Sequence, residues 1–475
     1  MATFYWHDYE TFGTDPSRDR PCQFAGIRTD FELNIIGEPL VEYCRPAADF
    51  LPQPMACLIT GITPQLALQK GLPEADFIRQ IHQELSQPGT CGVGYNSIRF
   101  DDEVTRYTLF RNFYDPYARE WQNGNSRWDL IDVVRLTYAL RPEGINWPTR
   151  EDGSPSFKLE QLTHANGIEQ QGAHDALVDV KATIELARLI RKHQPKLFDY
   201  ALSLRSKRDV AGLIDIPSRK PLLHISSRFP ASHGCAALVV PLAKHPRNSN
   251  GVIMANLSQD PASWIGLSVE EIQRRLFTRS SDLAEGEERI GLKTVHLNRS
   301  PMLAPAKMLD EVQAQRHHID LAACRRHWQA WKAMDAGVLA KVVEAMDSVP
   351  VPRADVDSQL YGDFIPDADK NLLLQVRQST PEELSRGPLP FSDKRLPEIL
   401  FRYRARNWPE TLSEEEAEHW QEHCFQRVTD PEAGASIVMD NFNAEIEQLL
   451  QKPELDDHSR SVLQALQQYG DQLLA

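Results

Sequence analysis

Short apolar runs alternate with helical periodicity along the first 194 residues of the chain. Apolar and β-prone side chains predict strands at residues 3–6, 23–28 and 91–95, and a strand pair at 33–44 with a turn near Gly37. Apolar positions at helical spacing predict helices at residues 73–85, 129–140 and 175–193. This alternation predicts an α/β domain with a central sheet over residues 1–194.

From residue 195 to 348 the pattern changes, because prolines punctuate shorter apolar runs. Two such runs, at residues 236–240 and 252–255, flank a turn-forming Asn-Ser-Asn-Gly segment. A single helix is predicted to begin after Ser268, with Glu271 three residues later as in a capping box. We therefore predict a small β-rich barrel or sheet domain with inserted helices.

A proline-containing linker near residue 350 precedes a third region, in which helical patterns continue to the end of the sequence. Helices are predicted there at residues 367–377, 381–386, 393–404 and 413–428, followed by long amphipathic stretches. The chain is predicted to hold three domains, at residues 1–194, 195–348 and 351–475. A length of 475 residues fits this number, at roughly 100–200 residues per domain.

Composition narrows the class of protein. The chain is 41% hydrophobic and 25% charged, as soluble globular proteins are, and has no apolar run of the ~18 residues that a membrane span needs. Its first residues lack the basic and apolar segments of a signal peptide, and its seven cysteines include no C-x-x-C pair. These features predict a cytoplasmic protein with no membrane partner, no disulfide framework and no zinc site.

The net charge of −15 disfavours a protein that coats nucleic acid non-specifically. Phosphate binding needs only a local cluster of arginine and lysine, however, so a basic groove that leads to a metal site stays open. Part of the acidic excess would also serve as metal ligands.

Three acidic positions in the first domain are candidate metal ligands. Asp8 and Glu10 lie at the end of the first predicted strand, where alternate residues project to the same side about 6–7 Å apart. Taken alone, such a pair is more often a solvated rim. Asp101 begins a predicted helix, and acidic residues there are favoured by the helix dipole, so it too has an ordinary structural explanation.

A further candidate pair lies at the start of the helix predicted at residues 175–193. Asp175 is a natural N-cap, which leaves His174 on the loop just before the helix and Asp179 one turn inside it. In isolation, a histidine beside a helical aspartate is more often a structural hydrogen bond.

Together these residues form a complete set for one chemistry. The four acids supply hard oxygen ligands, which suit Mg²⁺ or Mn²⁺ rather than zinc. Two such ions roughly 3.5–4 Å apart can activate a water and stabilise the departing oxygen of a phosphodiester. His174 has the unperturbed pKa of a base that takes the proton from that water. The sequence therefore predicts hydrolysis of phosphodiesters.

This set resembles the motifs of the DEDD exonuclease superfamily, in its histidine-containing branch. The matching motifs are Asp8-x-Glu10, residues 96–101 and His174-x-x-x-x-Asp179. Segments similar to the exonuclease I family in particular lie at residues 112–117, 139–147 and 401–407. The resemblance to that family runs over the entire chain.

The resemblance implies an RNase H-like α/β exonuclease domain, an SH3-like β-rich domain and an all-helical C-terminal domain. It implies a monomer that releases 5′-mononucleotides from the 3′ end of single-stranded DNA in repair and recombination, using two Mg²⁺ ions or Mn²⁺ in their place. In that family's mechanism, Asp8 would bridge both metals, Glu10 and Asp179 would complete the sites, Asp101 would hold metal or its water, and His174 would be the general base.

The resemblance also implies where DNA is bound. The matching positions are Glu10, Arg106, Tyr117, Trp121, Arg135 and Lys158. The family usually has arginine where this chain has Lys158, which keeps the charge but loses the bidentate fork, so a weaker grip on the substrate is expected. Phe113 and Trp128, in the same stretch, are either stacking platforms or core residues.

Two further groups carry looser expectations. Arg402, Tyr403, Arg404 and Arg406 mix cations with aromatics, which fits DNA binding or the solvated face of an amphipathic helix. Single-stranded DNA in a cell is coated by its binding protein, whose acidic tail recruits members of this family. The resemblance places the receiving site for that tail at Arg141, Tyr200 and Lys220.

Two other interpretations stay open. An RNA-directed exonuclease of the same superfamily would share the motifs, although such enzymes are much shorter than this chain. A catalytically silent nucleic-acid adaptor would keep the fold, but it would be expected to lack at least one catalytic residue, and all five are present. The sequence contains no glycine-rich phosphate loop that would indicate a kinase or dehydrogenase.

Overall fold

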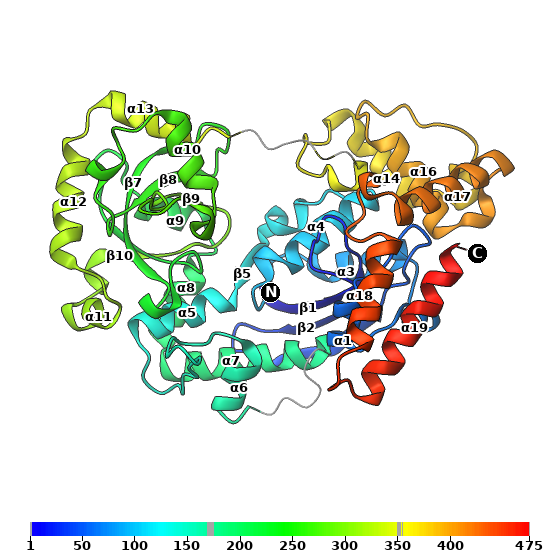
Figure 1. Ribbon diagram of the computed structural model, residues 1–475, viewed down its shortest axis with the longest axis horizontal. Helices are drawn as coiled ribbons and strands as arrows, with labels where there is room; N and C mark the ends of the chain where they lie inside the picture. Colours follow the sequence, from blue (N-terminus) through cyan, green and yellow to red (C-terminus); the bar gives the residue numbers. More distant parts are fainter. Residues whose placement is uncertain (1, 169–174, 349–352, 354, 475) are drawn as a thin grey trace. The chain divides into compact units, whose positions relative to one another are not determined.

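The computed structural model describes residues 2–168, 175–348, 353 and 355–474 (Figure 1). The chain forms two compact units, each assembled from separate segments of sequence. The first unit consists of Met1–Ser126, Gln170–Ile184 and Val351–Ala475, and the second of Arg127–Glu169 and Glu185–Pro350. The N-terminal region of the sequence therefore contributes to both units.

The first unit is built on a sheet in which β3, β2, β1 and β4 follow one another. The bounds of these strands are β1 Thr3–Thr11, β2 Pro21–Thr29, β3 Ile35–Tyr43 and β4 Thr90–Gly94. β1 pairs antiparallel with β2 and parallel with β4, so it lies inside the sheet with a neighbour on each side. The strands predicted at residues 3–6, 23–28 and 91–95 are confirmed as β1, β2 and β4.

The predicted pair of strands around Gly37 is wrong, because this segment forms the single strand β3. In its pairing with β2, Ile36 faces Arg28 whereas Leu40 faces Gly26, so the register shifts in between. Gly37 lies in this stretch with a φ of 73°, a conformation that glycine adopts readily. The glycine marks a bulge in an edge strand and not a reversal of the chain.

Helices from both ends of the sequence complete the first unit. The N-terminal helices are α1 Pro54–Thr60, α2 Pro64–Lys70, α3 Glu74–Leu85 and α4 Asp101–Arg111. The C-terminal helices, confirming the predicted helical region, are α14 Lys370–Gln378, α15 Pro381–Leu384, α16 Leu396–Asn407, α17 Glu414–Thr429, α18 Met439–Leu450 and α19 Asp457–Leu474.

The two sets of helices share apolar cores. Helices α18 and α19 lie beside α1 (Figure 1). Their side chains, among them Phe442 and Leu463, pack in one cluster with Cys57 of α1. A second cluster joins Phe113, which is fully buried just after α4, to Tyr403 of α16. Phe113 is therefore a core residue. The helix α7 (Ala176–His193) begins in the first unit and continues into the second.

The second unit contains a five-stranded antiparallel sheet in the order β10-β6-β7-β8-β9. The strands are β6 Leu222–Ile225, β7 Ala236–Lys244, β8 Gly251–Asn256, β9 Leu292–His296 and β10 Met302–Pro305. β7 and β8 confirm the two predicted apolar runs and pair across the predicted turn. Trp128, in the short strand β5 (Ser126–Asp129), is fully buried, so it too is a core residue.

The second unit is more helical than its sequence indicated. Its other helices are α5 Leu130–Leu140, α6 Leu159–Ala165, α8 Pro195–Ser203, α9 Lys207–Leu213, α10 Val269–Phe277, α11 Glu311–Arg316, α12 Leu321–Ala333 and α13 Ala336–Ala345. The predicted helix α10 is confirmed, with the Ser268 side chain accepting from the Glu271 backbone N–H. The expectation of inserted helices holds, and three of them begin at Asp310, Asp320 and Asp335, each of which caps a helix that apolar periodicity alone did not reveal.

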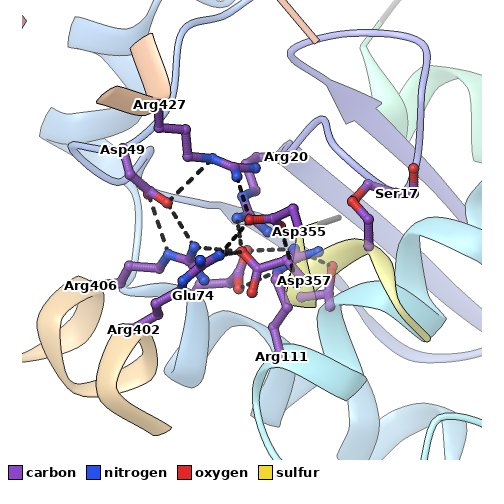
Figure 2. A network of polar contacts seen from close by, with 12 residues as sticks. Ser17, Arg20, Asp49, Glu74, Arg111, Asp355, Asp357, Arg402, Arg406 and Arg427 are labelled. Carbon is purple, nitrogen blue, oxygen red and sulfur yellow. Dashed lines mark hydrogen bonds and ion pairs between the residues drawn. The ribbon is translucent and has the colours of Figure 1, made fainter. Parts of the chain in front are cut away.

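A buried network of arginines and carboxylates joins the N-terminal and C-terminal segments of the first unit (Figure 2). Its shortest nitrogen–oxygen distances include Arg20–Asp357 at 2.9 Å, Arg406–Asp49 at 2.7 Å, Arg402–Asp355 at 2.7 Å, Arg427–Asp355 at 2.8 Å and Arg111–Glu74 at 2.8 Å. We call these residues the arginine–carboxylate network. The network connects parts of the first unit that are far apart in the sequence. These parts are the loops beside β2 and β3, the start of α3, the start of the C-terminal segment, and helices α16 and α17.

The expectation of a solvated face on α16 is wrong, whereas DNA binding by its arginines stays a prediction. The side chains of Arg402 and Arg406 are 9% and 6% exposed within the network, so they do not form a solvated face. Arg404 is also buried and pairs with Glu416 at 2.6 Å. The acids that hold Arg406 come from distant parts of the sequence, so local spacing did not reveal the pairing.

Among the described residues, no helix combines the length and the apolar character needed to cross a membrane. All seven cysteines are included in this part of the chain and are free thiols.

Candidate active site

Strand β1 carries two carboxylates on the face opposite Tyr5 and Tyr9, which belong to an apolar core cluster. Tyr9, which lies between them, is 4% exposed and packs against Phe24 on the core side. Because side chains alternate along a strand, Asp8 and Glu10 project together on the other side. Asp179 approaches from the first turn of α7, and one carboxylate oxygen from each of the three acids lies within 4.8 Å of the others.

Asp101 borders this trio from the start of α4, where it is 3% exposed. Its Oδ1 accepts a hydrogen bond from the backbone N–H of Tyr9 at 3.0 Å, and its carbonyl oxygen accepts one from the Thr105 hydroxyl at 2.8 Å. The carboxylate of Asp101 is thus anchored to β1 at the residue between the two strand acids. The structure brings the four predicted acids into one region.

These carboxylates oppose one another's ionisation. Burial raises the pKa of Asp8 well above its usual range, and the neighbouring carboxylates, first Asp101 and then Glu10, raise it further. Burial and then the charge of Asp179 raise the pKa of Glu10 to about 8. A divalent cation between the acids would remove this repulsion, and hard oxygen donors this close together fit Mg²⁺ or Mn²⁺.

The start of α7 is fixed by the predicted cap. Oδ1 of Asp175 accepts hydrogen bonds from the backbone N–H groups of Leu177 at 3.1 Å and Val178 at 3.3 Å, which confirms Asp175 as an N-cap. Asp179 follows one turn later, and its backbone N–H donates to the Asp175 carbonyl at 3.1 Å. His174, the predicted general base, lies outside the described residues.

Family models match almost the whole chain. They describe an exonuclease over residues 5–187, an exonuclease I SH3-like domain over 205–347 and an exonuclease I C-terminal domain over 354–473. Exodeoxyribonuclease I of Escherichia coli K12 is 47% identical over 476 residues, which covers 100% of this chain and 98% of that protein. The chain belongs to the exonuclease I family.

Other members of the exonuclease I family agree in sequence and fold. Exodeoxyribonuclease I of Haemophilus influenzae is 44% identical, with 99% of both proteins covered. The solved exonuclease I from Methylocaldum szegediense superposes with a TM-score of 0.95 at 52% identity, and that of E. coli in complex with a dA16 oligonucleotide with 0.94 at 47%. Both cover 100% of each chain. The predicted order of exonuclease, SH3-like and helical domains is confirmed.

Metal dependence is a property of this exonuclease family. A zinc ion bound form of the E. coli exonuclease I–single-stranded DNA complex also superposes on the chain, with a TM-score of 0.94. The carboxylate trio of Asp8, Glu10 and Asp179 is where the described residues fit a divalent ion.

The DNA-binding positions predicted in the first unit of this exonuclease differ in how open they are. Trp121 is 65% exposed, whereas Arg106 is 4% exposed and sits over the ring of half-buried Tyr117 at 5.2 Å. The Arg106 guanidinium pairs with Glu120 at 2.7 Å and Glu103 at 2.8 Å. Arg106 is therefore a buried, carboxylate-bound cation, and its contact with DNA stays a prediction.

Two DNA-binding positions predicted in the second unit also contrast. Arg135 is buried, pairs with Asp132 at 2.7 Å and lies 6.0 Å from the ring centre of Phe157. The Lys158 side chain is 66% exposed, and its Nζ lies 3.7 Å from Glu160. Lys158 thus offers an accessible charge, while Arg135 is held by its own helix.

The three residues predicted to receive an acidic tail all lie in the second unit. Arg141 and Lys220 are exposed. Tyr200 is half-buried, and its hydroxyl donates a hydrogen bond to the Leu303 carbonyl at 2.7 Å. The structure leaves both cations accessible and fixes the orientation of the tyrosine.

Sequence reasoning missed two supports of the carboxylate cluster. Gln23 faces Glu10 across the β1–β2 pairing and bonds to the start of α7, which only the strand register could have indicated. Arg119 pairs with Asp102 at 2.6 Å where both are almost fully buried, next to Asp101. In the sequence, Asp102 resembled one more acid favoured by a helix start.

Proposed function

We propose that this enzyme removes nucleotides one at a time from the 3′ end of single-stranded DNA. The observation that carries the proposal is the trio of Asp8, Glu10 and Asp179, assembled from β1 and α7 in a chain related over its whole length to exodeoxyribonuclease I. Clustered acids with mutually raised pKa values have no structural benefit, but they are what a divalent-metal hydrolase requires.

The trio would hold two Mg²⁺ ions, with Mn²⁺ as an alternative. When bound, the ions supply charge that activates a water and stabilises the leaving oxygen. Asp8 would be a ligand of both ions, and Glu10 and Asp179 would complete the ligand set. Asp101, anchored to the Tyr9 N–H, holds metal or its water.

The remaining step is a proton transfer. His174 accepts the proton of the attacking water as the new phosphorus–oxygen bond forms. The bond from phosphorus to the 3′ oxygen of the preceding nucleotide breaks, so the phosphate leaves on the 5′ oxygen of the released nucleotide. The product is a 5′-mononucleotide, and the shortened strand keeps a 3′ hydroxyl for the next cycle.

The residues predicted to bind DNA in each unit would hold the strand. Glu10 would contact the terminal nucleotide, exposed Trp121 and half-buried Tyr117 offer aromatic surfaces for bases, and Lys158 offers a charge for a phosphate. Arg106 and Arg135 contact DNA only if a phosphate replaces one of their carboxylate partners. Solved complexes of E. coli exonuclease I with dA16 and dT13 oligonucleotides support single-stranded DNA as the ligand.

RNA is the less favoured substrate. The oligoribonuclease of Marinobacter nauticus is only 24% identical, and the similarity covers 40% of this chain. The exodeoxyribonucleases match the full length, including the SH3-like and C-terminal domains. An adaptor without activity is not favoured either, since the acids of the cluster are all retained and assembled.

The surroundings of the enzyme follow from the same relationship. One solved exonuclease I structure that superposes on this chain is a complex with SSB-Ct, and we propose that the acidic tail of single-stranded DNA-binding protein binds at Arg141, Tyr200 and Lys220. We further propose action in the cytoplasm, as a monomer in DNA repair. The domain borders are proposed near residues 194 and 350.

The test compares four substrates in Mg²⁺: single-stranded DNA labelled at the 5′ or the 3′ end, duplex DNA and single-stranded RNA. Labelled mononucleotides should be released first from the 3′-labelled single-stranded DNA. No release is expected from the wild-type enzyme in EDTA or from the Asp179→Ala variant in Mg²⁺. Glu418→Ala, at an exposed acid of α17, is the matched control and should retain full activity. Faster loss of RNA, or an active Asp179→Ala enzyme, would overturn the proposal.

A further inference from the structure

Gln23 of β2 is a buried polar residue in the wall of the carboxylate cluster, with 1% of its surface exposed. It faces Glu10 across the β1–β2 pairing and Tyr43 across the β2–β3 pairing. Its sequence neighbour Phe24 points into the opposite, apolar core. Gln23 therefore shares the face of the sheet on which Asp8 and Glu10 lie.

Both ends of the Gln23 amide are bound to the start of α7. Oε1 accepts a hydrogen bond from the backbone N–H of Ala176 at 3.2 Å, and Nε2 donates to Oδ2 of Asp175 at 3.4 Å. The other carboxylate oxygen of Asp175 is engaged by the helix cap. One side chain of the sheet thus holds both the first backbone donor of α7 and its capping residue.

Only an amide of this length provides these two bonds together. Ala176 needs an acceptor and Asp175 needs a donor, and glutamine supplies one of each. Asparagine is one methylene shorter and would not span the same gap, while leucine has neither group. A glutamate would accept from Ala176 but would set a second carboxylate against Asp175.

The position of Asp179 depends on this attachment. It lies one turn inside α7, and its own backbone N–H bonds to the Asp175 carbonyl at 3.1 Å. One of its carboxylate oxygens lies within 4.8 Å of an oxygen of Asp8 and of Glu10, so this spacing depends on where the start of α7 is held relative to β1. Gln23 supplies such an attachment from β2, the strand that pairs with β1 at Glu10.

We propose that Gln23 is a positioning residue that holds Asp179 at metal-binding distance from Asp8 and Glu10. The residue does not itself contact the metal or the DNA in this role. It acts as an outer partner of the ligand set, and loss of such partners typically weakens metal binding roughly 10–100-fold. This role rests on the proposed function, because it assumes that the trio binds a divalent ion.

The experiment measures Mn²⁺ binding to the DNA-free protein by the loss of the free-ion signal in electron paramagnetic resonance. Gln23→Leu should weaken Mn²⁺ binding about tenfold and lower kcat on single-stranded DNA, with little change in KM for the strand. A higher Mn²⁺ concentration should restore part of kcat. Gln23→Asn, which keeps a polar group, should shift binding in the same direction and covers the case in which the leucine variant fails to fold.

Gln65→Leu is the matched control. Gln65 is half-buried in α2, and its Nε2 donates to the Ala465 carbonyl at 2.6 Å, so its loss removes a comparable tertiary hydrogen bond. This variant should lower the melting temperature but leave the Mn²⁺ dissociation constant unchanged. Wild-type Mn²⁺ affinity in both Gln23 variants would overturn the positioning role, whereas absence of Mn²⁺ binding in the wild type would overturn the proposed function itself.

Discussion

Two groups of buried carboxylates in the first unit have opposite surroundings. The neighbours that act most strongly on Asp8 are other acids, and burial and these charges raise its pKa. Asp49 and Asp357 are buried as deeply, and burial alone would raise their pKa values, but Arg406 and other arginines lower them well below the usual range. The arginine–carboxylate network has its counter-charges built in, while the carboxylate cluster requires a cation from solution.

The direction of the pKa shift distinguishes acidic residues that stabilise the fold from acidic residues that are proposed to bind metal. A buried acid paired with arginine is satisfied in the folded state, so removing it leaves a cation unpaired. A buried acid surrounded by acids is strained in the folded state, so removing it relieves repulsion and costs only activity. The two groups should therefore respond in opposite directions to the same kind of substitution.

The largest effect is expected at Asp8. The Asp8→Asn variant should lower kcat on single-stranded DNA at least ~1,000-fold, because the proposed shared ligand of the two metal ions is lost. The same variant should melt at a higher temperature than the wild type in EDTA, since one repelling charge is gone. Exonuclease assays and thermal unfolding in EDTA measure both values, and a lower melting temperature would contradict the comparison.

Asp357 should show the reverse. Asp357→Ala removes the buried carboxylate that pairs with Arg20 and leaves Arg406 with Asp49 alone, and breaking a buried ion pair typically costs about 3–5 kcal/mol of the free energy of unfolding. Urea denaturation measures this loss, and the folded fraction should keep its Mn²⁺ affinity. Asp367→Ala is the control, because its ion pair with Lys370 is solvent-exposed and its removal should leave the free energy of unfolding nearly unchanged.

Added Mg²⁺ should stabilise the carboxylate cluster and leave the network unaffected. At a free concentration 100 times the dissociation constant, a ligand that binds only the folded state adds about 2.7 kcal/mol of stability. Thermal unfolding in EDTA and in Mg²⁺ should show this gain in the wild type and in Asp357→Ala. The gain should vanish in Asp179→Ala, and an equal gain in all three proteins would place the metal elsewhere.

Lowering the pH should weaken the arginine–carboxylate network gradually. Burial opposes ionisation of Glu74, but Arg111 and then Arg20 lower its pKa from 4.5 to about 2. Because the folded pKa is depressed, the stability from Glu74 is complete above about pH 4.5 and is lost as the pH falls toward 2. Urea denaturation of the wild type and Glu74→Gln from pH 6 to 3 should show their difference shrinking. A constant difference would mean that charge is not the cause.

The smallest change is expected at Lys158, whose exposed charge lacks the rigid partners of the buried arginines. Lys158→Arg adds a planar fork that can bind a phosphate through two hydrogen bonds, so KM for single-stranded DNA should fall about threefold with kcat unchanged. The fall should diminish as salt is added. Lys192→Arg, at an exposed position of α7, serves as the control, and an equal effect there would indicate non-specific charge.

Much of the carboxylate cluster was predictable because its signals are local or alternate regularly. The two-residue spacing of Asp8 and Glu10 predicted that both lie on one face of a strand. Asp175, as an N-cap residue, predicted the start of α7. The network was not predictable, because Asp49 and Arg406 meet only through tertiary packing. Gln23 escaped notice for the same reason, since its partners at the start of α7 lie on a different element.

The fold shows the same division between local and distant causes. Long periodic helices such as α7 and α17 were found near their true ends, because their apolar spacing is a property of the segment itself. The segment of β3 was predicted as two strands because Gly37 was taken for a turn. A glycine with positive φ inside a bulge cannot be told from a turn glycine in the sequence. The short helices α11 to α13 were missed because they are marked by capping aspartates more than by apolar periodicity.

The shared core of α1, α18 and α19 has a consequence for synthesis on the ribosome. Phe12 and Cys57 belong to the same apolar cluster as Phe442 and Leu463, which are translated far later. A nascent chain that has already made β1 and its acids therefore leaves this core open to chaperones and proteases until the last helices emerge. Strand β1 is synthesised early but its surroundings are completed only when the last helices have been made. A prematurely terminated chain would therefore be poorly folded and open to degradation, and would not act as a free nuclease.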